Sequence, residues 1–279
     1  MLQSPMQNQF TEVERDAPFD FSEIPPDIRE SLCILIKPGP RYISGCPGKL
    51  YETMLSNIIP YTCKGVVYYQ GESDDIKGRI YGKLFSLMIE NWRHDFKNDE
   101  LFFLFVQLAA YGREGYPEGE LYPVLREQQK LVADTVANTG MVVAMDMGSM
   151  HDIHPRRKAP IGKRLALLAG EKVYRESIES SGPVFRNMEI KNGKVIINFD
   201  HVGSGLTIMG DKPKGFRICG GNRKYFDADA EISGDTVVLS SPDVPMPEAA
   251  SYGWANYMEV NLFNTEGLPA VPFRTDKYL

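Results

Sequence analysis

Between residues 49 and 174, apolar runs that suit buried strands alternate with segments whose apolar residues recur at helical spacing. The clearest strand patterns are Leu101–Leu108 (LFFLFVQL) and Met141–Met145 (MVVAM), which are almost wholly apolar, as expected for strands covered on both faces. In Ile76–Phe96 the apolar residues return every three or four positions, as one face of a helix requires. This alternation predicts parallel strands joined by helical crossovers, which is an α/β fold.

A further strand is expected at Gly65–Tyr69, and the remaining helices are expected at Leu50–Ile59, Tyr122–Thr135 and Ile161–Tyr174. After Gly182 the apolar period changes to two, and turn pairs such as Asn192-Gly193 separate short alternating runs, which predicts a small antiparallel β unit. The runs are Lys194–Phe199, Gly215–Cys219, Ala228–Ile232 and Thr236–Ser240. We therefore predict three parts: a Pro-rich, poorly patterned segment at 1–48, an α/β domain at 49–180 and a small β domain at 181–279.

The composition excludes several classes of protein. With 43% hydrophobic and 24% charged residues the chain is globular, and a net charge of −6 gives no basic surface for nucleic acid or an anionic membrane. No apolar run reaches the roughly 18 residues that cross a bilayer. The opening MLQSPMQNQF lacks a basic leader and an apolar core, so we expect no signal peptide and favour a cytoplasmic location.

In an open α/β sheet the binding site lies beyond the carboxyl ends of the strands. One of the loops expected there follows MVVAM, and it contains His151 and His154 on either side of Asp152, although the whole chain has only four histidines. This pattern suits a general base, His154, with Asp152 or Asp146 as its orienting carboxylate. Two alternatives remain open: a polar loop whose Asp caps the next helix, and a metal site that lacks a fourth ligand.

The turn QGESD follows the strand at Gly65–Tyr69. The amide of Gln70 and the backbone N–H of Gly71 are donors of the kind that a developing oxyanion needs. Glu72 and Ser73 can line the same substrate site or can instead bond neighbouring backbone in a tight turn. Ser73 is the weaker nucleophile candidate, because no G-x-S-x-G elbow surrounds it.

Several ordered strings together resemble the sialate O-acetylesterase family of the SGNH-type serine esterases. They are LYETMLSNIIPYTCKGVVYYQGESD, FVQLAAYG, LREQQ, NTGMVVAMDMGSMHDIHPRRKAPIGKRLALLA and YGWANYMEVNLFNTEGLPAVPFRTD. The resemblance implies a three-layer α/β/α fold that hydrolyses O-acetyl esters of sialic acid or related sugars without a metal or another cofactor. It places the base at His154 and the supporting acid at Asp152. Many relatives have Asn where this chain has Asp74, so the donors fall to Gln70 and Gly71.

The nucleophile of the family lies in a GQSNM-like block at the end of a first strand. The nearest string here is LQSPM, which makes Ser4 the candidate nucleophile, although no strand pattern precedes it and a tail without fixed structure is the alternative. Three hypotheses follow: an esterase that uses Ser4 or a second chain, a silent module that binds acetylated glycans, or a shortened product whose open sheet edge drives self-association. In each case the expected partner is an O-acetylated sugar, with no nucleic acid and no membrane.

Overall fold

The computed structural model describes residues 48–59, 61–112 and 115–276, so the candidate nucleophile Ser4 lies outside the described residues. The chain divides into two compact units. The described part of the first comprises 48–59, 61–64 and Lys83–Leu101, and the second comprises Gly65–Gly82 and the residues from Phe102 onward. Every described residue of the candidate site belongs to the second unit.

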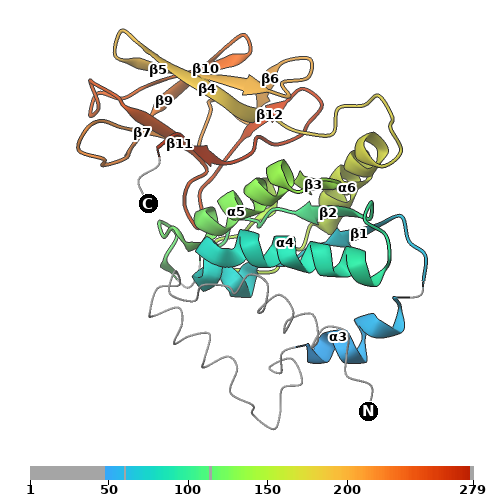
Figure 1. The fold of residues 1–279 in the computed structure, drawn as a ribbon. Helices are drawn as coiled ribbons and strands as arrows, with labels where there is room; N and C mark the ends of the chain where they lie inside the picture. The colour runs from blue at the N-terminus through green and yellow to red at the C-terminus, as the bar shows by residue number, and fades with distance from the viewer. Residues whose placement is uncertain (1–47, 60, 113–114, 277–279) are drawn as a thin grey trace. The chain divides into compact units, whose positions relative to one another are not determined.

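The described part of the first unit is mainly helical. It holds α3 (Lys49–Thr53), the 3-10 turn η3 (Leu55–Asn57) and most of α4 (Gly78–Asp95), as Figure 1 shows. The hydroxyl of Tyr51 donates a hydrogen bond of 2.6 Å to Asp95 at the end of α4. One continuous helix was expected over Leu50–Ile59, but Met54 (φ −123°, ψ −64°) leaves helical geometry and splits the segment in two.

The second unit contains a parallel sheet in the order β1-β2-β3. Its strands are β1 (Gly65–Tyr68), β2 (Phe102–Val106) and β3 (Thr139–Val142). Gly65 lies opposite Phe102, and Phe103 lies opposite Thr139. The predicted parallel pairing is therefore confirmed, and all three strands end at the same edge.

Helices α5 (Leu121–Thr135) and α6 (Lys158–Lys172) lie next to this sheet, as Figure 1 shows, and both contact β3. Helix α6 packs on one face, where Ile161 and Leu168 meet Leu104 and Val142 in an apolar cluster. Side chains alternate along a strand, so the buried Phe103 points to the opposite face.

Strand β3 ends three residues earlier than the predicted run MVVAM. Ala144 (φ −125°, ψ 14°) turns the chain into η6 (Met145–Met147), so Met145 is buried at the edge of the sheet and lies outside its ladder. An unbroken apolar run cannot show where a strand stops, because burial continues into the turn.

The predicted antiparallel β unit is confirmed as two packed sheets. The first, in the order β4-β5-β10-β9, contains β4 (Val184–Lys191), β5 (Lys194–Asp200), β9 (Asp229–Ser233) and β10 (Thr236–Ser240). The second, in the order β13-β11-β7-β8, contains β7 (Phe216–Cys219), β8 (Phe226–Asp227), β11 (Ala249–Tyr252) and β13 (Phe273–Arg274). A short pair joins β6 (Leu206–Ile208) to β12 (Leu262–Asn264). Ile197 and Leu239 of the first sheet share a core with Ile218 and Tyr252 of the second.

The last part of the chain returns from the β unit to helix α5. The side chain of Asn256 accepts a hydrogen bond of 3.0 Å from the backbone N–H of Tyr122. Arg274 donates twice to Glu127, at 3.1 Å each, and its guanidinium lies 4.5 Å from the ring centre of Trp254. Trp254 is therefore a packing residue.

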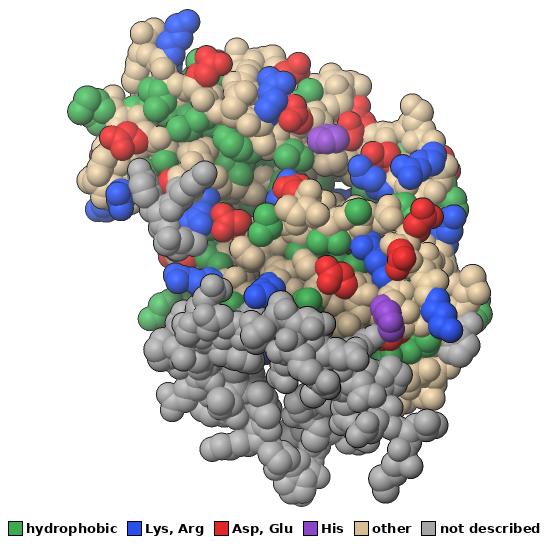
Figure 2. All heavy atoms as spheres, viewed as in Figure 1, with side chains coloured by type: hydrophobic (Ala, Val, Ile, Leu, Met, Phe, Trp, Pro, Cys, Tyr) green, Lys and Arg blue, Asp and Glu red, His purple; other side chains and the backbone are tan. Residues whose placement is uncertain are grey.

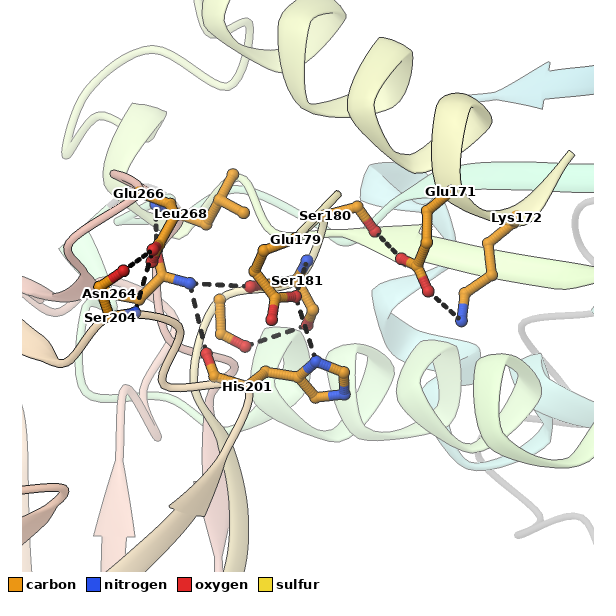
Figure 3. Close-up of polar contacts among 11 residues, drawn as sticks. Glu171, Lys172, Glu179, Ser180, Ser181, His201, Ser204, Asn264, Glu266 and Leu268 are labelled. Atoms are coloured by element: carbon orange, nitrogen blue, oxygen red, sulfur yellow. Dashed lines mark hydrogen bonds and ion pairs between the residues drawn. The ribbon is translucent and has the colours of Figure 1, made fainter. Parts of the chain in front are cut away.

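A polar cluster joins α6, the segment before β4 and the ends of β5 and β12 (Figure 3). Ser180 donates to Glu171 of α6, and the ring of His201 lies 3.2 Å from Glu179. The amide of Asn264 donates to the carbonyl of Ser181 at 3.0 Å. The α/β layer and the β unit thus meet through polar contacts that range from buried to exposed.

On the face drawn in Figure 2, Lys and Arg side chains are interspersed with Asp and Glu over the described residues. This matches a chain with 31 basic and 37 acidic residues. Among the described helices, none is both long enough and apolar enough to cross a membrane.

Candidate active site

The loops that follow β1, β2 and β3 lie side by side at the carboxyl edge of the sheet. The backbone N–H of Ser149, after β3, donates to the carbonyl of Ala110, after β2, at 3.0 Å. The ammonium group of Lys158 lies 4.4 Å from the ring centre of Tyr69, the residue after β1. These contacts join neighbours of the QGESD turn and of the His loop, and the closeness of Gln70 and Gly71 to His154 stays a prediction.

The turn after β1 begins at Gly71, whose φ of 150° is rarely adopted by residues with a side chain. A Cβ at this position would also lie 3.1 Å from Leu108 and 3.2 Å from Leu125. The turn continues as the 3-10 helix η4 (Glu72–Lys77), and the N–H of Asp74 closes it on the carbonyl of Gly71 at 2.9 Å. Glycine thus allows the chain to turn at the end of β1 in close contact with Leu108 and Leu125.

Gln70 is held on both sides of its amide. Its Nε2 donates to Asp74 at 2.6 Å, and Asp74 in turn pairs with Lys77 at 2.8 Å. The hydroxyl of Tyr81 lies 3.2 Å from both the backbone carbonyl and Oε1 of Gln70. Because a primary amide has two N–H groups, the bond to Asp74 leaves Gln70 one donor for an oxyanion.

The tyrosines around this turn stay protonated at neutral pH. Burial, followed by the charge of Asp74, raises the pKa of Tyr68 to about 12. Burial and the nearby Glu72 do the same for Tyr69, whose pKa is raised to about 12 and whose hydroxyl is buried without a partner among the described residues. Burial raises the pKa of Tyr81 further, so this hydroxyl can donate to Gln70 throughout the physiological range.

The motif LREQQ supplies two supporting residues whose roles were not predicted. Gln129 accepts from the N–H of Leu108 at 2.9 Å and donates to the carbonyl of Gln70 at 3.3 Å, so it connects the ends of β2 and β1. Arg126 is fully buried and donates to the sulfur of Met145 and to the carbonyl of Ala255. Burial lowers the pKa of Arg126 to about 9.

The loop after β3 is shaped by Asp152. Its Oδ1 accepts the backbone N–H of His154 at 3.0 Å, and its Oδ2 accepts from the guanidinium of Arg156 at 3.2 Å. These two bonds, the first being the stronger influence, lower the pKa of Asp152. Asp152 and His154, the predicted acid and base, are thus linked through the backbone N–H of His154. The imidazole of His154 is exposed.

Asp146, the alternative orienting carboxylate, is engaged elsewhere. It forms a two-pronged ion pair with Arg164 of α6, at 2.8 and 2.6 Å, and Arg164 also donates to the carbonyl of Val143. Both side chains are more than nine-tenths buried. Such a pair fixes the turn after β3 and leaves Asp152 as the carboxylate close to His154.

The remaining predicted residues lie in the same region with fewer contacts. Ser73 is exposed on η4, and Glu72 is half-buried beside Tyr69. Arg156 is almost fully exposed, in keeping with a solvated basic run. Within the part of the chain that the structure describes, no group of His, Cys, Asp and Glu side chains is arranged to hold a metal ion.

A family model and several curated proteins match this chain, and all of them are sialic acid acetylesterases. Residues 40–169 match the model of the family described as "Carbohydrate esterase, sialic acid-specific acetylesterase". The sialate O-acetylesterase of Mus musculus is 28% identical over 96% of this chain and 52% of its own length, and that of Homo sapiens is 29% identical over 80% and 48%. The chain therefore spans about half the length of these curated relatives.

A solved structure agrees with these matches. The crystal structure of a carbohydrate acetylesterase from Xanthomonas citri superimposes with a TM-score of 0.78 at 38% sequence identity, covering 84% of this chain and 55% of that protein. The mixed fold, with its parallel sheet and antiparallel sheets, is thus similar to the fold of a known carbohydrate acetylesterase. Together these findings confirm the resemblance read from the motifs: the chain is similar to sialic acid-specific acetylesterases among the carbohydrate esterases.

Proposed function

We propose that this chain hydrolyses O-acetyl esters of sialic acid or related sugars, with His154 as the general base of a serine esterase. The observation that supports this most is that the braced QGES turn and the His154 loop follow strands β1 and β3 of one parallel sheet, whose strands end at the same edge. The names of the related proteins supply the class of substrate. The proposal includes an SGNH-like three-layer arrangement for the α/β part.

In the proposed reaction a serine hydroxyl attacks the acetyl carbonyl while His154 accepts its proton. The tetrahedral intermediate collapses when the C–O bond to the sugar breaks, and the imidazolium returns the proton to the departing sugar oxygen. Water, activated by the same imidazole, then attacks the acetyl-serine and releases acetate. No cofactor is needed for either half of this cycle.

The negative charge of the intermediate has two donors available in the QGES turn. These are the second N–H of the Gln70 amide and the backbone N–H of Gly71, both positioned by the contacts of Tyr81, Asp74 and Gln129. Glu72 and Ser73 line the same turn and are assigned to substrate contact.

Asp152 supports His154 in two ways. It holds the backbone of the loop at the base, and its low pKa keeps a negative charge near the imidazolium that forms. For the nucleophile we propose Ser4, with a serine supplied by a second copy or partner chain as the alternative that the same experiment separates.

The test is hydrolysis of an activated acetyl ester and of an O-acetylated sialic acid by the full chain, compared with Ser4→Ala, Ser73→Ala and His154→Ala. We expect His154→Ala and Ser4→Ala each to lower kcat by about a thousandfold or more, as loss of a triad member does. Ser73→Ala tests the weaker nucleophile candidate and should retain most of the wild-type kcat.

Retention of activity in Ser4→Ala together with its loss in Ser73→Ala would move the nucleophile to Ser73. Activity that appears only at high protein concentration would assign the serine to a second copy. Binding of the acetylated sugar without any turnover by the chain would contradict the esterase and support a glycan-binding module instead.

A further inference from the structure

A cleft of about 430 Å³ lies beside the candidate active site, between the α/β layer and the β unit. We call it the Arg217 cleft, and the lining residues that matter are Glu118, Met150, Lys214, Arg217, Tyr257 and Met258. Met150 directly precedes His151, so the cleft and the loop of His154 share one segment of chain. The volume falls within the range of sites for small molecules.

Arg217 of β7 is the central charged residue of this cleft. Its guanidinium is held on one side by Glu118 at 2.7 Å and on the other by Asp227 at 2.9 Å. The arginine is only 22% exposed, whereas Glu118 and Asp227 are mostly open to solvent. A fixed guanidinium with five N–H donors therefore stands between two carboxylates that retain free acceptor positions.

The opposite walls are tied together through the backbone. The N–H of Tyr257 donates to the carbonyl of Pro117 at 2.9 Å, and the N–H of Asn256 donates to the carbonyl of Gly119 at 2.7 Å. Lys214 pairs with Glu259 at 2.7 Å on the rim. A site whose walls are already fixed loses little conformational entropy when a ligand enters.

The chemistry of this lining suits a sugar ring. Each sugar hydroxyl is both a donor and an acceptor, and here donors and acceptors alternate around Arg217, Glu118 and Asp227. The ring of Tyr257 with the side chains of Met150 and Met258 offers apolar surface for the C–H face of the sugar. Because the charges already pair with one another, a neutral hydroxyl can bind without leaving a charge uncompensated.

We propose that the Arg217 cleft binds a sugar ring of the acetylated substrate and so gives the β unit a role in substrate selection. This inference rests on the proposed function for the identity of the substrate, but the cleft can be tested without catalysis. The ligand is a hydroxyl-rich sugar, either acidic, with a carboxylate that Lys212 on the rim can meet, or neutral.

The first test uses the methionine methyl groups as reporters. The full chain, labelled with 13C-methyl methionine, is titrated with N-acetylneuraminic acid and, separately, with methyl β-galactoside. We expect saturable shifts of the Met150 and Met258 methyl signals, while the exposed Met209 and Met246 serve as internal controls and stay unmoved. Unmoved signals of Met150 and Met258 up to the solubility limit of both sugars would overturn the proposal.

The second test removes the guanidinium of Arg217, which donates to both carboxylates. Arg217→Ala should weaken sugar binding about tenfold, as loss of one or two hydrogen bonds does, and Arg217→Lys should recover only part of it, since a lysine cannot bridge two carboxylates. Arg186→Ala is the matched control, because Arg186 is an exposed arginine of β4 paired at 3.5 Å with Asp200. Equal affinity of Arg217→Ala and wild type would contradict the proposal.

Kinetics separate this inference from the proposed function. Arg217→Ala should raise KM for an O-acetylated sialic acid about tenfold and leave hydrolysis of a small activated acetyl ester unchanged, because that ester has no sugar ring to bind in the cleft. If wild type hydrolyses neither ester but Met150 and Met258 still report sugar binding, the esterase proposal fails and the cleft stands. If both esters respond equally to Arg217→Ala, the cleft proposal fails and the esterase stands.

Discussion

Gln129 is a fully buried amide whose hydrogen bonds join two strand ends. It accepts from Leu108 and donates to the carbonyl of Gln70, with the carbonyl of Val106 at 3.4 Å as a second acceptor. The polarity of the amide matters, because the site demands one acceptor and one donor at fixed positions. At the scale of single residues, the position of Gln70, a proposed oxyanion donor, therefore depends on the buried Gln129.

Gln129→Glu keeps the acceptor for Leu108 and removes the donor to Gln70. We expect kcat to fall about tenfold with little change in KM, because the QGES turn shifts while the substrate surface is kept, and we expect unfolding free energy to fall by about 1–3 kcal/mol. Steady-state kinetics and urea unfolding measure both effects.

Gln128→Glu, at the neighbouring and only half-buried position, is the control and should behave as wild type. A purely structural role for Gln129 would appear as lost stability with an unchanged kcat for the folded protein.

The sequence contained a signal for these supporting residues. Arg126 and Gln129 fall at the spacing of the buried Tyr122, Leu125 and Val132, so polar side chains stand on the apolar face of α5. A buried polar group must find partners, and such a pattern predicts a network. What the sequence could not reveal is the identity of those partners, since they come from strand ends and from Ala255, far away in the chain.

At the scale of elements, the loops after β2 and β3 are in backbone contact. Ser149 bonds to Ala110 and forms an isolated parallel bridge with Tyr111. This approach requires Gly148, because a Cβ there would fall on the backbone of Ala110. The contact sets the start of the segment that carries Asp152 and His154.

Gly148→Ala should therefore push the two loops apart. Backbone cannot yield as a flexible side chain does, so we expect a loss of about 1–3 kcal/mol in unfolding free energy and a lower kcat, measured by urea unfolding and ester hydrolysis. Gly162→Ala, within α6 and with open space around its Cβ position, is the matched control and should be neutral or stabilising by up to about 1 kcal/mol. Equal stability of the two variants would show that the loops can separate freely.

The helices of the α/β part were predicted from apolar periodicity and its strands from apolar runs, and in the β unit β10 was predicted with its observed bounds. Strand β11 was not, because its residues AASY are buried on both faces and show no alternation. Strands β8 and β13 have only two residues each, too few to carry a period. Such short strands form because they pair with the neighbouring strands β11 and β7, and a local sequence pattern does not show this pairing.

At the scale of the whole described chain, the junction in Figure 3 links the α/β layer to the β unit through ionisable groups. Burial acts to raise the pKa of Glu171, but the hydrogen bond from Ser180 and the adjacent Lys172 outweigh it, so the pKa is lowered. A lowered carboxyl pKa stabilises the fold fully above the unfolded value, about 4.3. That stabilisation disappears as the pH falls through the folded pKa.

Ser180→Ala should thus lower unfolding free energy by about 1–2 kcal/mol above pH 5 and make stability less dependent on pH below it. Thermal unfolding between neutral pH and the acid limit measures this. Ser204→Ala, which removes a hydroxyl from the exposed Glu266 at 2.8 Å, is the control and should change little. Parallel pH profiles of wild type and Ser180→Ala would contradict the role of the junction.

The contacts of the last residues with α5 have a consequence for biosynthesis. Helix α5 and its strands leave the ribosome early, yet Tyr122, Arg126 and Glu127 each have a hydrogen-bond partner near the end of the chain, in Asn256, Ala255 and Arg274 respectively. The α/β layer can therefore complete its packing only after the β unit has been translated. Until then the side chain of Arg126 stays hydrated. Domains usually fold in the order of their synthesis. Here the later part of the chain completes the earlier one, so a stop codon before Ala255 would remove these contacts from the α/β layer as well as shorten the β unit.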